Sequence, residues 1–114
     1  MKITVGSGST ALHYEVTKVG NDVLVLIIGG AAHIGCTAVG DDGRISTYTA
    51  QAHRDDALAV PLAQTISMEF HCVCTVCAGF HLDGIAKEEI QKVLVNAEDG
   101  IKRVIAALKE LKKA

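Results

Sequence analysis

Three histidines lie where predicted strands and helices end, and an imidazole at such a place can bind a metal, carry a proton or contact an anion. His33 follows a diglycine, His53 precedes a predicted helix and His81 ends an apolar run. Because the ends of separate strands can meet at one edge of a sheet, where α/β proteins usually hold ligands, we expect these side chains to converge. His13, within a predicted strand on its solvent face, and His71, at the start of another strand, are weaker candidates.

Carboxylates accompany two of these histidines, because Asp55 follows His53 and Asp83 follows His81, each two residues later. If the strand that ends near His81 extends that far, the period of two puts Asp83 on the same face. The pair could supply two metal ligands, or it could be a histidine that a carboxylate orients. His33, His53 and His81 could together hold a divalent metal, although they show no local ligand spacing of the kind found in zinc motifs.

A diglycine, Gly29-Gly30, precedes His33 and could present backbone amides to a phosphate group. It matches neither the dinucleotide-binding fingerprint nor the P-loop, since both need a glycine-rich turn that opens a helix. We therefore place Gly29 and Gly30 in the candidate site beside His33, without a nucleotide motif to support them.

The cysteines are less promising. Cys72 and Cys74 point to one face of a predicted strand and Cys77 points to the other, so the three cannot converge on a metal. A redox Cys-x-x-Cys would also need a helix N-terminus beneath its first thiol, and Cys74 lies in the middle of the strand. We predict reduced cysteines in the core, which indicates a cytoplasmic protein.

The elements that position these residues form one predicted domain, residues 1–114. The run Val23–Ile28 is continuously apolar, as is typical of a central strand covered on both faces. Asp55 or Asp56 should cap the helix that follows, and Pro61 should cost that helix one hydrogen bond. Strands are expected at 11–19, 23–28, 33–39, 44–50 and 71–80, and helices at 55–69 and 86–113. The order of four strands, helix, strand and helix predicts an α/β (α+β) fold, with a single mixed, mostly antiparallel sheet and helices packed on one face.

Composition limits the classes of function. Hydrophobic residues make up 49% of the chain and charged residues 21%, which is typical of a globular domain. The net charge of −2 comes from interspersed acids and bases, so neither nucleic acid nor a membrane surface is an expected partner. The strand-like pattern of Met1–Thr4 has no signal-peptide features, which again favours the cytoplasm.

Three segments carry a family resemblance: LIIGGAAHIGCTAV at 26–39, HRDDALAVPLA at 53–63, and GFHLDGI at 79–85 followed by KEEI at 87–90. In this order and spacing they resemble the small D subunit of gallate decarboxylase, a family of prenylated-flavin chaperones similar in fold to proteasome-assembly-chaperone domains. The resemblance implies a non-catalytic carrier that binds prenylated FMN, or FMN, and passes it to the catalytic subunit of a UbiD-type decarboxylase. It also implies a homodimer and a site made of these positions: Gly29, Gly30, His33, His53, Asp55, His81 and Asp83.

Two other functions remain open. In a metal-dependent enzyme, the three histidines and Asp83 would hold a metal whose bound water is the nucleophile. In an assembly chaperone without a small ligand, a sheet edge or the last helix would contact a partner protein.

Overall fold

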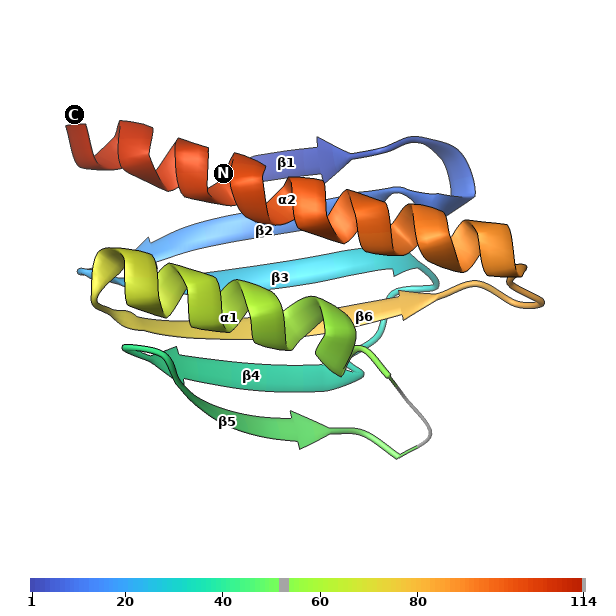
Figure 1. Ribbon diagram of the computed structural model, residues 1–114, viewed down its shortest axis with the longest axis horizontal. Helices are drawn as coiled ribbons and strands as arrows, with labels where there is room; N and C mark the ends of the chain where they lie inside the picture. The colour runs from blue at the N-terminus through green and yellow to red at the C-terminus, as the bar shows by residue number, and fades with distance from the viewer. Residues whose placement is uncertain (52–53, 114) are drawn as a thin grey trace.

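The computed structural model describes residues 1–51 and 54–113, and its six strands form one mixed sheet in the order β1-β2-β3-β6-β4-β5. Both helices pack on the same face of this sheet (Figure 1), so the predicted α+β fold is confirmed. The elements are β1 Lys2–Val5, β2 Leu12–Val19, β3 Asp22–Gly30, β4 Cys36–Asp41, β5 Arg44–Thr49, α1 Asp56–Phe70, β6 Val73–His81 and α2 Lys87–Lys113. Strand β1 adds one strand to the predicted order, at the sheet edge beside β2.

Strands β3 and β6 lie at the centre of the sheet and pair in parallel, whereas their outer neighbours pair antiparallel with them. The register puts Gly29 opposite Phe80 and Gly30 opposite His81. Because both strands run in the same direction, the diglycine and the end of β6 lie at one edge of the sheet. This parallel pair explains how segments fifty residues apart in sequence meet.

The two faces of β3 have different surroundings. Val23, Val25 and Ile27 are buried beneath the helices. On the other face Leu24 is 43% exposed, and Leu26 and Ile28 are half-buried. The prediction that this strand is covered on both faces was therefore wrong for the single chain.

Helix α1 begins at Asp56, close to the predicted start, and buries Leu58, Leu62 and Ile66 against the sheet. Pro61 lies inside the helix and, having no N–H, leaves one hydrogen bond of the second turn unmade. Met68, near the end of this helix, is 54% exposed and lies against Gly43.

Helix α2 has a long apolar stripe, of which Val93, Val104 and Leu108 are buried. In the described part of the chain no helix is long and apolar enough to cross a membrane.

Candidate functional site

The segment 31–35 crosses the end of β6 and carries His33. The amide of Ala31 donates to the carbonyl of His81 at 2.9 Å, and that of Gly35 donates to the carbonyl of Ala78, also at 2.9 Å. Between these two bonds the segment passes over Gly79, where a Cβ atom would overlap the carbonyl of His33. The glycine at position 79 therefore allows the close approach that fixes His33 over the strand end.

Both ring nitrogens of His33 face acceptors. Nδ1 lies 3.0 Å from the carbonyl oxygen of Ala31, and Nε2 lies 3.1 Å from Oδ2 of Asp55. A carbonyl oxygen and a carboxylate can only accept, so this geometry favours the imidazolium, with a proton on each nitrogen. The hydrogen bond to the Ala31 carbonyl, opposed by partial burial and reinforced by Asp55, raises the pKa of His33 above its usual value. Both contacts therefore favour the protonated ring and hold it in place at the end of the sheet.

Asp55 joins three segments of the site. Its carboxylate is 7% exposed; Oδ2 faces His33, and Oδ1 accepts a 2.9 Å hydrogen bond from the amide of Phe80. A Cβ at position 35 would overlap this carboxylate, so Gly35 makes room for it. The predicted capping role was wrong, because no side-chain cap hydrogen bond forms at Asp55. The carboxylate is used to tie the start of α1 to the end of β6.

His81 approaches His33 from the end of β6. Their ring centroids are 6.3 Å apart and the rings are nearly perpendicular, at 84°. Nε2 of His81 lies 2.7 Å from Oδ1 of Asp83, although the strand ends at His81 and Asp83 lies in the following turn. The predicted histidine–carboxylate pair is confirmed, as is the convergence of His33 with His81. His53 lies outside the described residues.

The diglycine has a packing explanation that needs no phosphate. A Cβ at Gly29 would overlap the Phe80 ring and the Ala11 carbonyl. Gly30 has a positive φ of 62°, and a Cβ there would overlap the carbonyl of His81. A role for Gly29 and Gly30 in holding a cofactor stays a prediction.

The metal interpretation gains no support from this geometry. Within residues 1–51 and 54–113, no group of three or more His, Cys, Asp and Glu side chains is arranged to hold a metal ion. A ring nitrogen that donates a hydrogen bond has no lone pair left for a metal, and both nitrogens of His33 point at acceptors.

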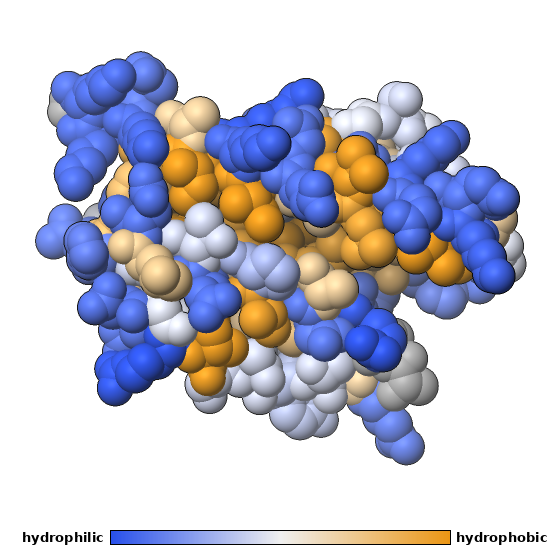
Figure 2. Space-filling model, in the orientation of Figure 1, coloured by the Kyte–Doolittle hydropathy of each residue, from blue (hydrophilic) through white to orange (hydrophobic). Residues whose placement is uncertain are grey.

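A cleft of about 470 Å³ opens beside Asp55 and His81, between the first turns of α1 and α2. Its volume is in the range of pockets that hold drug-sized molecules. Most of its lining is apolar, while Arg54, Asp55 and His81 supply the polar groups. Figure 2 shows apolar surface that runs between the helices toward this end of the molecule. The lining residues are Arg54, Asp55, Ala57, Leu58, Phe80, His81, Ile85, Ile90, Val93 and Leu94.

The sequence interpretation missed two residues of this cleft, Arg54 and Phe80. Arg54 is exposed at the mouth of the cleft, and its Nε lies 3.5 Å from Oδ1 of Asp56. Phe80, one of two phenylalanines in the chain, is half-buried in the wall. Phe80 could have been found in the sequence, because it is a rare aromatic residue directly before His81. The cleft could not, because it forms only when α2 packs beside α1.

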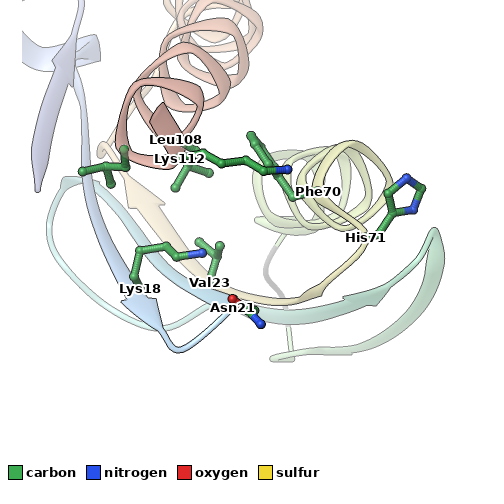
Figure 3. A pocket seen from close by; sticks show the side chains of 8 residues that line it. Lys18, Asn21, Val23, Phe70, His71, Leu108 and Lys112 are labelled. Atoms are coloured by element: carbon green, nitrogen blue, oxygen red, sulfur yellow. The ribbon is translucent and has the colours of Figure 1, made fainter. Parts of the chain in front are cut away.

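A second pocket, of about 530 Å³, lies at the opposite end of the sheet, near the ends of both helices. Lys18 and Lys112 reach over an apolar floor that includes Val23 and Leu108 (Figure 3), while His71 points away from the hollow. His71 does not open a strand as predicted; it ends α1 with a left-handed φ of 49°. Its ring lies 3.2 Å from Asp42, and both side chains are exposed. The charges here are borne by long, flexible side chains.

The cysteines behave as predicted. All four are free; Cys36, Cys72 and Cys74 are buried, and Cys77 is half-buried. Burial raises the pKa of the Cys74 thiol to about 12, so this thiol is a poor nucleophile near neutral pH. His13 is exposed on its strand, also as predicted.

Comparisons with known proteins agree with the fold and name a family. The family model described as a prenylated flavin chaperone LpdD-like domain matches residues 6–109. No curated protein matches the chain. Among solved structures, a chain from a chaperone complex for yeast 20S proteasome assembly is similar, with a TM-score of 0.64 and 15% sequence identity. That match covers 96% of this chain and 94% of the yeast chain, and at this identity it shows a shared fold.

Proposed function

The chain belongs to the family of prenylated flavin chaperone LpdD-like domains, and on this premise we propose that it is a non-catalytic carrier of prenylated FMN. It binds the cofactor in the cleft between α1 and α2 and delivers it to the catalytic subunit of a UbiD-type decarboxylase. The working form is a cytoplasmic homodimer. The four free cysteines support a reducing compartment.

The observation that carries this proposal is an apolar cleft with a guanidinium and an imidazole, those of Arg54 and His81, at its mouth. A flavin combines a planar aromatic ring system with an anionic phosphate. Phe80, Leu58 and Ile90 offer the ring system an apolar wall, and Phe80 can stack on it. Arg54 offers the phosphate a planar guanidinium that can donate two hydrogen bonds at once.

The histidines have different tasks in this proposal. His33, whose ring is held by Ala31 and Asp55, keeps the Asp55 carboxylate in place at the wall of the cleft. In the neutral imidazole of His81, an Nε2 that donates to Asp83 leaves Nδ1 as an acceptor for a donor group of the ligand. Together with His53, which belongs to the site by resemblance, they hold and orient the cofactor, and Gly29 and Gly30 keep the strand ends close.

The bound cofactor would supply the decarboxylation chemistry only after transfer to the enzyme. This chain's own residues bind it, keep water from one side of it and release it. A divalent metal between phosphate and imidazole is not part of the proposal, because neither ring nitrogen of His33 has a free lone pair in this arrangement.

Co-expression with a flavin prenyltransferase tests the proposal. Native mass spectrometry and absorbance should show one prenylated FMN per chain in the purified protein. The loaded protein should also activate a cofactor-free UbiD-type decarboxylase, and Ile90→Glu, with a carboxylate in the cleft, should do neither. A colourless wild-type protein without added mass would contradict carriage, and a loaded protein that never activates the enzyme would contradict delivery.

An assembly chaperone without a small ligand is the second candidate. It is favoured by the shared fold with the yeast chaperone-complex chain and by the half-exposed apolar face of the sheet. It predicts that His33→Ala and His81→Ala leave capture of the partner protein intact. Loss of flavin binding together with unchanged partner capture would separate the two functions.

A further inference from the structure

Strand β5 forms one edge of the sheet, and residues 1–51 and 54–113 place no other element along that edge (Figure 1). It pairs with β4 on one side only, and all of its residues except Ile45 are exposed. Proteins usually protect such an edge with charges, a proline, a bulge or a covering loop, because its free backbone groups pair readily with other strands. Arg44, at the start of β5, is the only charged residue of the strand, and the rest have the side chains of a good strand former: Ile45, Ser46, Thr47, Tyr48 and Thr49.

The opposite edge of the sheet is protected in the usual way. Strand β1 has only four residues, one of which is Lys2, and α2 contacts it. A short strand with a lysine offers little to an incoming strand. The two edges therefore differ, and β5 is the edge that remains open to pairing.

The backbone groups that β5 offers follow from the register of its hairpin. The amide of Ala50 donates at 2.7 Å to the carbonyl of Gly35, which directly precedes β4. Successive residues of an antiparallel strand point their backbone groups to opposite sides, so every second residue back from Ala50 also faces β4. The residues between them, whose N–H and C=O groups point outward from the sheet, are Ile45, Thr47 and Thr49.

Helix α1 gives this edge an uncharged wall. Gln64 donates to the carbonyl of Gly43 at 3.3 Å, and Met68 lies against the same glycine. Val60 precedes Gln64 by one helical turn, so the three side chains lie on the side of α1 that faces the β4–β5 hairpin. On the other face of the strand Tyr48 is 74% exposed. A segment beside β5 would thus meet apolar and neutral polar side chains on both of its faces.

We propose that β5 docks an extended, uncharged segment of the enzyme that receives the cofactor, and that this segment joins the sheet as a seventh strand. In this mode of recognition the main chain gives affinity and alternate side chains give specificity. The outward groups of Ile45, Thr47 and Thr49 pair with the backbone of the segment. Its side chains lie alternately against Met68 on α1 and against Tyr48 on the other face. The identity of the partner rests on the proposed function, whereas the strand pairing does not.

A second copy of this chain fits the edge less well. Two β5 strands side by side would form a contact about 20 Å long and one strand wide. That is much smaller than the roughly 800 Å² that each partner contributes to a standard interface. A flexible segment gains the same backbone hydrogen bonds and can also lay its side chains on Met68 and Tyr48.

Docking on β5 places the partner at the cofactor end of the sheet. Strands β5 and β6 both run antiparallel to β4, so Thr49 and His81 lie at the same end. Gly35, which accepts the hydrogen bond from Ala50, also makes room for the Asp55 carboxylate in the wall of the cleft. Among the described residues that line the cleft, none belongs to β5. The segment therefore holds the enzyme near the cleft while the cofactor is still bound.

Hydrogen exchange tests the strand pairing. The full chain without flavin is measured alone and with the cofactor-free decarboxylase of the delivery experiment, and mass spectrometry with fragmentation resolves single amides. In the free chain the amides of Thr47 and Thr49 should exchange fast and that of Tyr48 slowly. In the complex the first two should slow at least about tenfold. Fast exchange of both in the complex, or no complex, would overturn the proposal, as would protection that rises with the concentration of the chain alone, which would assign the edge to a second copy.

Two substitutions test the edge without disturbing the β4 ladder. Thr47→Pro removes one outward N–H, and an edge strand tolerates proline where its N–H faces solvent. Tyr48→Lys puts a charge on the edge. Each should weaken binding of the decarboxylase at least about tenfold, and Val95→Lys, at a 61% exposed position on α2, should bind like wild type. Circular dichroism confirms that the variants fold, and unchanged binding of both β5 variants would overturn the proposal.

Flavin titration of the same proteins separates this proposal from the proposed function. Thr47→Pro and Tyr48→Lys should load flavin like wild type and activate the decarboxylase less. If both activate the enzyme as well as wild type, docking through β5 is wrong and carriage stands. If wild type docks through β5 but never loads flavin, carriage is wrong and the docking stands.

Discussion

The two ends of the sheet each have a pocket and a histidine paired with an aspartate, but the two ends are built differently. At the histidine end, Asp55 is buried and tied to the Phe80 amide and to His33. At the lysine end, His71 and Asp42 pair in solvent, and the amines of Lys18 and Lys112 are on flexible stems. A site whose charges are already fixed loses little entropy when a ligand binds. The smaller cleft is therefore the better binding site, because hydrogen bonds hold Asp55 and His81 in place there, although Arg54 is exposed.

The largest effect on stability and flavin binding is expected from a substitution that disrupts the backbone packing at the histidine end. Gly79→Ala would put a Cβ onto the His33 carbonyl and force the 31–35 segment away from β6. Overpacking of this kind costs about 1–3 kcal/mol or more, and His33 would lose its position. Urea unfolding should show this loss, together with loss of flavin binding.

The matched control is Gly20→Ala at the lysine end, where a Cβ would meet nothing but φ is 62°. The left-handed backbone should cost about 1 kcal/mol, with unchanged flavin affinity. A Gly79→Ala variant that is as stable as wild type and binds flavin normally would contradict the close approach of the 31–35 segment to β6 at Gly79.

The second prediction concerns the buried ion pair. Asp55→Asn removes the charge that faces His33, and should cost about 1.5–3 kcal/mol, as for hydrogen bonds to charged groups. Because the folded-state pKa of His33 is raised, its stabilising contribution is fully present below its ordinary value of about 6.5 and is lost as pH rises through the folded pKa. The difference between wild type and Asp55→Asn should therefore be largest below about pH 6.5 and shrink at higher pH.

The exposed pair supplies the control for Asp55. Asp42→Asn, beside His71, should change the free energy of unfolding by less than about 0.5 kcal/mol. NMR titration of the His33 ring reads the pKa directly and should show a lower value in Asp55→Asn. An unchanged pKa would mean that the carboxylate does not hold the imidazolium.

The third prediction separates binding from folding. Ile90→Glu puts a carboxylate into the cleft at the start of α2, where the helix dipole tolerates it. Flavin affinity should fall at least about tenfold, because a charge would be desolvated against the ring system. The free energy of unfolding should hardly change. The matched control is Val95→Glu, also on α2 but outside the cleft, where the native side chain is 61% exposed. Equal affinities of the two variants would exclude the cleft as the site.

The smallest effect on flavin affinity is expected from Asp83, which pairs with His81 at the mouth of the cleft. Asp83→Asn weakens an exposed contact with His81, and exposed ion pairs contribute about 0–1 kcal/mol. Flavin affinity should change by less than about fivefold by isothermal titration calorimetry, with no change in unfolding. A loss as large as that of Ile90→Glu would mean that Asp83 contacts the cofactor directly.

Much of this fold could be predicted from local pattern, and much of the site from the positions of its residues. The alternation of apolar and polar residues, together with the turn residues, predicted five of the strands. The positions of His33 and His81 at the ends of predicted elements predicted that the two residues meet. The short strand β1 forms by pairing with β2, and four residues are too few for their pattern to predict this pairing.

The remaining features depend on contacts between distant segments. The use of Asp55 could not be foreseen, because its partner amide on Phe80 is 25 residues away and competes with the capping role. The apolar pattern of β3 predicted cover on both faces, but in the single chain only the face with Val23, Val25 and Ile27 is buried.

Anaerobic titration with reduced prenylated FMN tests the central claim most directly. Arg54→Ala combined with His81→Ala alters the histidine end, and Lys18→Ala combined with Lys112→Ala alters the lysine end. We expect wild type and the lysine-end variant to bind one equivalent with the same affinity, and the histidine-end variant to bind at least about tenfold more weakly, for the loss of charged hydrogen bonds. Loss of binding in the lysine-end variant alone, or no binding by wild type, would contradict the account.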